Sequence, residues 1–241
     1  MPDCAIIVPA RLGSQRFPRK LLEPVAGKPL ILHTADNLRR IAGHWPVYFA
    51  VAEAELAAVL EASGYPVIRT DPDLPSGTDR IAVANREIGA SVVVNVQGDE
   101  PVLQAGHLEQ VVKILDASAD MATLATPFAS LEDFRDPQKV KVVCGQDGRA
   151  LYFSRSPVPF ARDSGGGLPS EAYWHLGLYA YRGSLLEAFL KWAPTPLEQI
   201  ERLEQLRVLE KGGCIRVGIT RQRTIGVDTA EDLQTFKEHL A

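Results

Sequence analysis

Apolar residues in the first half of the chain fall into short continuous runs, separated by stretches with helical periodicity. Such runs are typical of strands buried on both faces of a parallel sheet. We expect strands at residues 5–8, 47–51, 66–69 and 91–96. Apolar positions every three or four residues predict helices at 30–42, 54–63 and 76–88. This alternation predicts right-handed crossovers and a mainly parallel α/β sheet flanked by helices.

The second half is richer in short strands. The predicted strands are 121–126, 139–145, 149–153, 173–181 and 215–220, with a hairpin turn at 146–148. The predicted helices are 184–192, 197–211 and 230–240, and Glu201 and Gln205 would share one face of the second by their spacing. We interpret residues 1–241 as one domain in which residues 121–182 contribute a smaller β-rich lobe.

Composition narrows the class of protein. With 241 residues, 46% of them hydrophobic and 23% charged, the chain is an ordinary globular protein. A net charge of −4 argues against a general nucleic-acid binder. The three cysteines lie far apart without CxxC spacing, which predicts reduced thiols rather than a zinc site or disulfides. We find no signal peptide and no apolar stretch near the roughly 20 residues of a membrane helix, so we expect a cytoplasmic protein without membrane insertion.

A basic loop follows the first predicted strand. Arg11, Arg16, Arg19 and Lys20 fall within ten residues. Ligands bind open α/β sheets at the carboxyl ends of strands, so this loop predicts an anion site suited to a polyphosphate. A solvated basic turn is the alternative. Because these cations repel one another without an anion, we expect that removing the Lys20 charge would preserve stability or slightly raise it.

Carboxylates follow two other apolar stretches. Asp99 and Glu100 come just after the strand at 91–96, and Asp228 ends the apolar stretch that begins at Thr224. Magnesium takes one or two carboxylates together with substrate phosphates. We therefore predict metal binding for Asp99, with a solvated turn as the alternative. For Glu100 the two interpretations stay equally open, and Asp228 could instead be the N-cap of the last helix.

Four ordered motifs carry a family resemblance. They are Pro9-Ala10-Arg11 with Ser14, Arg16, Pro18 and Lys20; Asn-Val-Gln-Gly-Asp-Glu-Pro at 95–101; His-Leu-Gly-Leu-Tyr at 175–179; and Leu-Glu-Gln-Leu-Arg at 203–207. Together they resemble the 3-deoxy-manno-octulosonate cytidylyltransferases, the CMP-Kdo synthetases of bacterial lipopolysaccharide assembly. The resemblance covers nearly the whole chain in the right order, and it implies a nucleotide-diphospho-sugar transferase-like fold.

The resemblance also implies a reaction and its site. CTP and 3-deoxy-D-manno-octulosonate (Kdo) would give CMP-Kdo and diphosphate, with Mg²⁺ as cofactor and a homodimer formed through the lobe, which would also bind the sugar. The implied catalytic residues are Arg11, Lys20, Asp99 and Asp228, the two aspartates being the metal ligands. The implied nucleotide-binding residues are Pro9, Ala10, Arg11, Ser14, Arg16, Lys20, Ser76, Gly77, Arg80, Gln97, Gly98 and Asp99. The implied sugar-binding residues are Gln97, Arg155, Arg162, His175, Tyr179, Glu204 and Gln205.

Two other functions stay open at this point. A cytidylyltransferase for another acidic sugar, of the sialic acid or 8-amino-Kdo type, is the nearer one; the sugar-binding set favours Kdo, although the triglycine at 165–167 departs from the longer, more charged segment expected there. The other is a non-catalytic nucleotide-binding module. Loss of Lys20, Asp99 or Asp228 would have favoured it, and all three are present.

Overall fold

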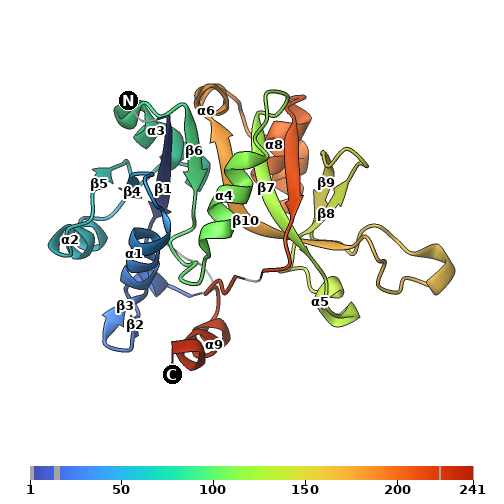
Figure 1. Cartoon of the computed structure of the whole chain (residues 1–241), viewed down its shortest axis with the longest axis horizontal. Coiled ribbons are helices and arrows are strands. Elements are labelled where there is room, and N and C mark those ends of the chain that lie inside the picture. The colour runs from blue at the N-terminus through green and yellow to red at the C-terminus, as the bar shows by residue number, and fades with distance from the viewer. Residues whose placement is uncertain (1–2, 14–16, 223, 241) are drawn as a thin grey trace. The chain divides into compact units, whose positions relative to one another are not determined.

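The computed structural model describes residues 3–13, 17–222 and 224–240, and the chain divides into two compact units. Unit 1 comprises Met1–Leu108, Arg182–Leu190 and Thr224–Ala241, and unit 2 comprises Glu109–Tyr181 and Lys191–Arg223. Figure 1 shows the chain coloured from one end to the other.

Unit 1 is built on four parallel strands in the order β6-β1-β4-β5. They are β1 (Cys4–Ala10), β4 (Val47–Val51), β5 (Val67–Arg69) and β6 (Val92–Asn95). Ile6 of β1 lies opposite Val47 on one side and Val94 on the other. Ile6, Ile7 and Val8 are fully buried, as expected for a strand covered on both faces. The predicted parallel α/β architecture is confirmed.

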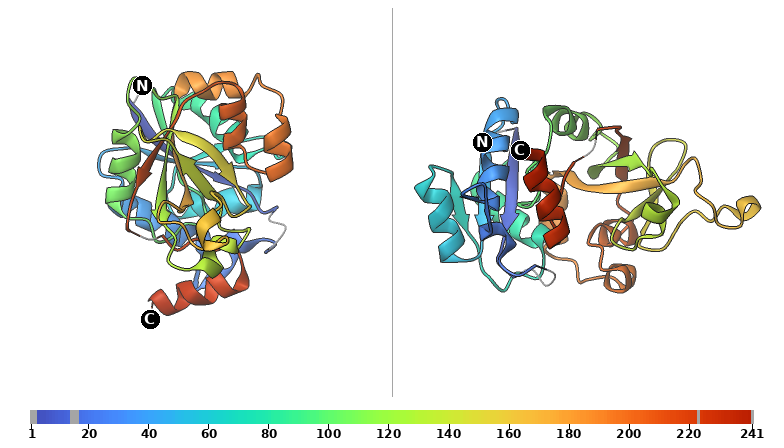
Figure 2. Two further views of the ribbon diagram at one scale, coloured as in Figure 1. Left: turned by 90° about the vertical axis from the view of Figure 1, so that its right-hand side faces the viewer. Right: turned by 90° about the horizontal axis from the view of Figure 1, so that it is seen from below.

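The helices between these strands fall on opposite faces of the sheet. They are α1 (Leu30–Ile41), α2 (Ala54–Ala62) and α3 (Gly77–Ile88). The chain moves outward from β1 to β4 and β5, and then returns past β1 to β6. Because such crossovers are right-handed, α3 lies on the face opposite α1 and α2, as Figures 1 and 2 show. The strand order therefore reverses between β1 and β6, and this is the point at which open α/β sheets bind ligands.

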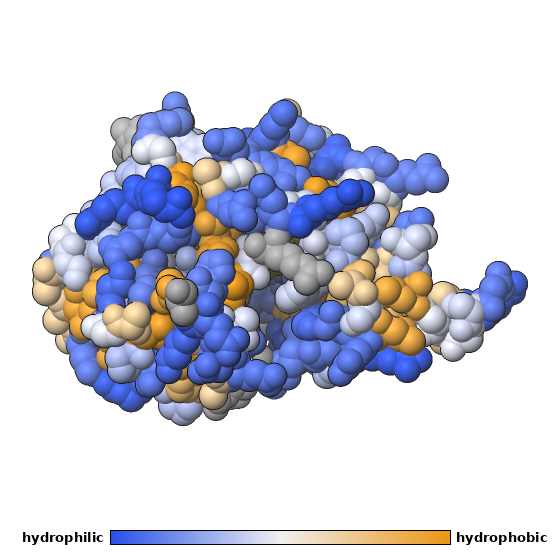
Figure 3. All heavy atoms as spheres, turned by 60° about the horizontal axis from the view of Figure 1, so that its bottom comes forward, coloured by the Kyte–Doolittle hydropathy of each residue, from blue (hydrophilic) through white to orange (hydrophobic). Residues whose placement is uncertain are grey.

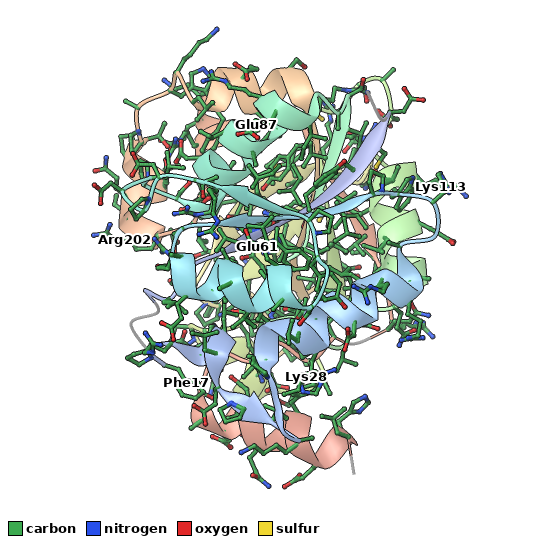
Figure 4. All side chains as sticks on the ribbon, turned by 90° about the vertical axis from the view of Figure 1, so that its left-hand side faces the viewer. Phe17, Lys28, Glu61, Glu87, Lys113 and Arg202 are labelled. Atoms are coloured by element: carbon green, nitrogen blue, oxygen red, sulfur yellow. The ribbon has the colours of Figure 1, made fainter. Side chains whose placement is uncertain are left out.

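Five other segments, three before α1 and two from the second half of the chain, belong to unit 1. They are η1 (Lys20–Leu22), the short strands β2 (Pro24–Val25) and β3 (Lys28–Pro29), α6 (Gly183–Phe189) and α9 (Ala230–Leu240). Val25, Leu30, Val227 and Phe236 form a buried cluster on which Phe17, labelled in Figure 4, packs partly buried. This cluster fixes the C-terminal helix and the segment before it to the start of α1.

The first turn of α9 is capped by Thr229 rather than by Asp228. The Asp232 amide donates to the Thr229 hydroxyl at 3.1 Å, and the Thr229 amide donates to the Asp232 carboxylate at 2.8 Å. These two reciprocal contacts form a capping box. Asp228 is therefore not the N-cap, and its side chain contacts Lys20 instead.

Unit 2 contains a mixed sheet. Its strands are β7 (Met121–Pro127), β8 (Lys141–Cys144), β9 (Ala150–Ser154), β10 (Tyr173–Arg182, whose last residue belongs to unit 1) and β11 (Ile215–Ile219). β10 pairs antiparallel with β7 and β8, β8 pairs antiparallel with β9, and β11 pairs parallel with β7. All five predicted strands are present, with bounds that differ by at most two residues.

The helices of the second half agree less well with those predicted from the sequence. They are α4 (Ala105–Lys113, which begins in unit 1), α5 (Leu131–Arg135), η2 (Arg162–Ser164), α7 (Pro196–Glu201) and α8 (Gln205–Glu210). The predicted helix at 197–211 is wrong because Arg202 adopts a left-handed conformation (φ 56°) that divides α7 from α8. No helix of the described ranges is long and apolar enough to cross a membrane.

Candidate active site

The basic loop leaves β1 and is held at its start by a carboxylate. Pro9 and Ala10 end the strand, and Arg11 is exposed. The Leu12 amide donates to Oε1 of Glu53, which follows β4, at 3.0 Å. Glu53 obeys the same pattern as Asp99, a carboxylate just past a buried strand, and that pattern would have identified it from the sequence. Ser14 and Arg16 lie outside the described residues.

Lys20 forms the centre of the site in unit 1. Its ammonium Nζ lies 2.5 Å from Asp99 Oδ2 and 2.8 Å from Asp228 Oδ1, with the Lys20 side chain 9% exposed. Burial disfavours the charged form of Lys20, but the combined attraction of Asp99 and Asp228 outweighs it and raises the pKa of Lys20. Three residues from distant parts of the sequence thus meet at the carboxyl ends of the β-strands.

This ion pair overturns one expectation. We expected the cations of the loop to repel one another, so that losing the Lys20 charge would not lower stability. Instead, Lys20 is neutralised by Asp99 and Asp228, and Arg19 pairs with Glu55 at 2.6 Å. The expectation for Lys20 is therefore wrong. Removing its charge would leave two neighbouring carboxylates without their cation.

Glu100, next to Asp99, has a different environment. Its Oε2 is buried without a hydrogen-bond partner, and its carboxylate accepts a hydrogen bond from the Thr224 side chain. Burial, together with the nearby charge of Asp99, raises the pKa of Glu100 to about 8. The carboxylate is therefore directed to the segment that carries Asp228.

The donor set fits Mg²⁺ in combination with phosphate. Among the described residues, no group of three or more His, Cys, Asp or Glu side chains is arranged to hold a metal ion alone. Mg²⁺ commonly takes only one or two carboxylates and completes its shell with water and phosphates. Asp99 and Asp228 already share a cation, the Lys20 ammonium, so their oxygens converge on a position of positive charge.

The N-terminus of α3 lies beside the end of β1. A Cβ built on Gly77 would lie 3.8 Å from the Pro9 side chain, so the two segments are in contact. Ser76 caps the helix by accepting from the Asp79 amide at 3.1 Å. Arg80 is 1% exposed and donates to Asp71 O at 3.1 Å, while its Nη2 has no partner. Burial and, more weakly, the charge of Arg11 lower the pKa of Arg80. This part of the site therefore keeps one guanidinium nitrogen without a hydrogen-bond partner, although the charges of Glu53 and Asp71 lie near it.

Gln97 and Gly98 begin the loop after β6. Gln97 donates from Nε2 to Asn95 Oδ1 at 2.9 Å. A Cβ on Gly98 would come within 3.0 Å of Ile31, and the Gly98 carbonyl accepts from the Thr34 hydroxyl at 2.8 Å. The absence of a side chain at Gly98 lets this loop pack onto α1, which fixes the approach of Asp99.

In unit 2, His175 and Tyr179 flank an irregularity of β10. The pairing of β10 with β7 shifts register between Leu176 and Tyr179, and the two rings lie with centroids 5.3 Å apart. His175 Nε2 is 3.0 Å from the Thr123 hydroxyl, and burial lowers the pKa of His175 to about 3. Burial, with minor contributions from Tyr181 and Glu204, raises the pKa of Tyr179. Both rings are neutral at physiological pH.

The remaining predicted sugar-binding residues differ in their surroundings. Gln205, at the start of α8, is buried and its Nε2 has no partner; Glu204 directly precedes the helix. Arg155 donates to the carbonyls of Glu201 at 2.8 Å and Pro137 at 3.0 Å. Arg162 is 91% exposed and pairs with its neighbour Asp163.

Glu201 organises this region, a role that the sequence did not reveal. Its carboxylate accepts from the Ser154 hydroxyl at 2.6 Å and from the Arg155 amide at 2.9 Å. Because the helix breaks at Arg202, Glu201 does not share a helix face with Gln205 as predicted. Nothing in the local sequence marks this break, since neither glycine nor proline occurs there.

The fold and the site of unit 1 define a nucleotidyltransferase: a basic loop after β1 and paired carboxylates at a strand-order reversal. A family model described as cytidylyltransferase matches residues 5–224. The 3-deoxy-manno-octulosonate cytidylyltransferase of Anaeromyxobacter sp. (strain Fw109-5) is 45% identical over 243 residues, covering 100% of this chain and 98% of that protein. The corresponding protein of Geobacter metallireducens is 43% identical, with 98% and 96% covered.

A solved structure agrees with these relatives. CMP:2-keto-3-deoxy-manno-octonic acid synthetase, complexed with CTP, superimposes with a TM-score of 0.90 at 34% identity and covers 98% of both chains. A cytidylyltransferase from Leptospira borgpetersenii, at 16% identity and a TM-score of 0.64, shares the fold. The chain belongs to the cytidylyltransferase family and, within it, to the 3-deoxy-manno-octulosonate cytidylyltransferases.

The ion pair of Lys20 predicts the behaviour of Lys20→Met. Without Mg²⁺ or nucleotide, we expect the free energy of unfolding to fall by about 1–3 kcal/mol, because a buried pair loses one partner while Asp228 stays partly solvated. We also expect kcat/KM for CTP to fall by roughly 10- to 100-fold or more, because a charge-assisted hydrogen bond is lost. Urea denaturation and steady-state kinetics measure the two effects.

Lys28→Met is the matched control, since Lys28 forms an exposed ion pair with Asp36. Such surface pairs contribute about 0–1 kcal/mol. If Lys20→Met were no less stable than Lys28→Met, the Lys20 ion pair would not contribute to the fold.

His175 predicts a dependence of stability on pH. Its pKa of about 3 in the folded chain lies below the ordinary 6.5, so below pH 6.5 the unfolded chain binds a proton that the folded chain does not. Stability is therefore lost as pH falls from 6.5 toward 3, by about 2 kcal/mol at pH 5 for this group. Between pH 7 and pH 5, we expect the free energy of unfolding of His175→Gln to fall by about 2 kcal/mol less than that of the unsubstituted chain. Urea denaturation at the two pH values measures this difference. The exposed His44→Gln is the control, and equal losses in all three chains would contradict the prediction.

Proposed function

We infer that this chain transfers the cytidylyl group of CTP to Kdo, giving CMP-Kdo and diphosphate, and so activates Kdo for lipopolysaccharide biosynthesis. The chain is a nucleotidyltransferase, and its full-length identity to 3-deoxy-manno-octulosonate cytidylyltransferases supports this sugar over other acidic sugars. The observation that carries the mechanism is the meeting of Lys20 with Asp99 and Asp228 in unit 1.

The nucleotide would occupy the reversal point between β1 and β6. Arg11 and Lys20 would neutralise the triphosphate, and transfer of this kind depends mainly on positioning and charge neutralisation. An ammonium has three N–H donors, and the two carboxylates use two of those of Lys20, which leaves the third for a phosphate oxygen. The base would lie near the N-terminus of α3, where Gly77 contacts Pro9 and Arg80 has an unpartnered Nη2.

The metal ion proposed here is Mg²⁺, held by Asp99 and Asp228. When bound, it would supply charge neutralisation at phosphate oxygens and lower the pKa of the attacking sugar hydroxyl. The chain's own contribution would be to hold both carboxylates beside Lys20, so that the anionic substrate and the cation approach the same point. Gly98 keeps the Asp99 loop against α1.

The sugar would be bound by unit 2. Kdo carries a carboxylate, for which arginine offers bidentate hydrogen bonds. Arg162 is exposed on η2, and Tyr179, Glu204 and Gln205 supply hydroxyl, carboxylate and amide groups for sugar hydroxyls. His175 is fully enclosed and neutral, so its contribution is to support β10 rather than to exchange a proton.

We also propose a homodimer formed through unit 2. Several large apolar side chains of this unit are exposed: Leu151 at 63%, Phe160 at 70% and Ile200 at 76%. Figure 1 shows the segment between β9 and β10 extending away from the sheet of unit 2, and Figure 3 shows apolar residues on the right-hand part of its view, over this unit. Apolar side chains exposed in this number are typical of a surface that another chain covers.

The metal assignment predicts that Asp99→Asn and Asp228→Asn each abolish turnover while the chain stays folded. Each change removes a negative charge from the Mg²⁺ site but keeps the shape of the side chain. Diphosphate release at a series of Mg²⁺ concentrations, with circular dichroism as the folding control, tests this. Near-normal turnover of either variant at limiting Mg²⁺ would exclude that aspartate as a ligand.

The sugar assignment predicts that Arg162→Ala raises the KM for Kdo by roughly 10- to 100-fold with little change in the KM for CTP. Its stability should be unchanged, because Arg162 is 91% exposed. Arg155→Ala should raise the KM for Kdo similarly and also lower the melting temperature, because Arg155 donates to two backbone carbonyls. Equal effects on the KM values of both substrates would place either arginine outside the sugar site.

A further inference from the structure

The two predicted metal ligands come from segments that are separated by more than a hundred residues, and the structure ties these segments together. The Val227 amide donates to the carbonyl oxygen of Asp99 at 2.9 Å. Val227 itself is fully buried in the apolar cluster of unit 1, and the Asp228 amide donates to Asp232 at 3.0 Å. The backbone of Asp228 is thus held from both sides.

Glu100 adds a side-chain link between the same segments. Its carboxylate accepts from the Thr224 side chain, four residues before Asp228. Its other contact is with Gly226, where a Cβ would lie only 2.8 Å from Glu100 Oε1 and 3.3 Å from its carboxyl carbon. No φ of the left-handed type requires glycine at this position. A side chain at 226 would therefore require the Glu100 carboxylate to shift.

The orientation of Glu100 argues against both interpretations that the sequence left open, a metal ligand and a solvated turn. Lys20 contacts Asp99 and Asp228, whereas the Glu100 carboxylate faces Thr224 and Gly226, and its Oε2 is buried without a partner. Burying a carboxylate oxygen without a partner costs free energy, so a surface turn would not retain it. A role in fixing the distance between Asp99 and Asp228 explains why the Glu100 carboxylate is buried here.

We propose that Glu100 is a positioning residue that locks the segment 224–228, through Thr224 and the close approach of Gly226, so that Asp228 faces Asp99 across the cation position. This inference rests on the proposed metal site of Asp99 and Asp228. Glu100 acts through the geometry of that pair and is not itself a third ligand. Gly226 is part of this link because a larger residue would displace the carboxylate from its position.

The test measures the binding of Mn²⁺ by electron paramagnetic resonance, with CTP present and Kdo absent. The KM for Mg²⁺ and kcat are measured separately by steady-state kinetics. Thr224→Val keeps the shape of the side chain and removes the hydroxyl, and Thr224→Ser keeps the hydroxyl. We expect Thr224→Val to weaken Mn²⁺ binding about 5- to 10-fold, in line with loss of one hydrogen bond. Thr224→Ser should stay within about twofold. In both variants kcat at saturating Mg²⁺ should change by less than about threefold, because the ligands remain.

A double-mutant cycle tests Gly226. Gly226→Ala alone should weaken Mn²⁺ binding to a similar extent, whereas in a Glu100→Ala background it should add less than about twofold, because the carboxylate it displaces is already absent. Glu100→Gln keeps an acceptor oxygen and the length of the side chain, so it should retain Mn²⁺ affinity within about threefold of the unsubstituted chain.

Asp99→Asn is the reference that separates this inference from the proposed function. If it leaves Mn²⁺ binding unchanged, the metal site itself is wrong and the inference fails with it. If it abolishes Mn²⁺ binding while folded Thr224→Val and Gly226→Ala bind normally, only the positioning role is wrong. A loss in Glu100→Gln as large as that in Asp99→Asn would make Glu100 a ligand and overturn the proposal.

Discussion

Two carboxylates held a few ångströms apart repel each other, and the described site of unit 1 is possible because Lys20 lies between them. Asp99 lies in the loop after β6, Asp228 precedes α9 and Lys20 begins η1, so the two ion pairs of Lys20 join three segments that are far apart in the sequence. The Lys20 side chain is almost buried, and its attraction to both aspartates exceeds the cost of its burial. A site built in this way is already shaped for a cation and for the anionic substrate that accompanies it.

The position of this ion pair follows from the topology of the sheet. β1 and β6 are adjacent parallel strands, so the loops that follow them begin at the same edge of the sheet, and Lys20 and Asp99 meet there. The strand order reverses between these two strands, which is where open α/β sheets bind ligands. The basic loop is then anchored by Glu53 through the Leu12 amide, and the Asp99 loop is anchored by the contact of Gly98 with Ile31.

The sequence predicted the elements whose cause is local. Buried strands such as Val47–Val51 and the capped helix Ala230–Leu240 were predicted with the bounds that the structure has, because their apolar pattern and cap residues lie within the element. The residues of the candidate site could be placed near strand ends, but their pairing could not be predicted. That Lys20 is neutralised by Asp99 and Asp228 depends on a contact across 208 residues, and the error about the stability of Lys20→Met came from considering the loop charges alone. The break at Arg202 was missed for a similar reason: tertiary contacts of Glu201 with Ser154 and Arg155, rather than a glycine or proline, accompany it.

The buried cations of unit 2 have different partners from those of unit 1, which accords with the substrates proposed for the two units. Two buried cations of unit 2 are paired within the unit. Lys141 donates to the carbonyls of Asp136 and Arg155, and Arg207 forms an ion pair with Glu198 at 2.5 Å. In unit 1, by contrast, Arg80 keeps an unpartnered nitrogen. A polyanion such as a nucleotide triphosphate needs hydrogen-bond donors that the chain has not already used, whereas the proposed acidic sugar needs a rigid frame with a few directed hydrogen bonds and a cation for its carboxylate. In unit 2 the buried cations therefore stabilise the frame, whereas in unit 1 the Arg80 guanidinium retains a donor for a substrate oxygen.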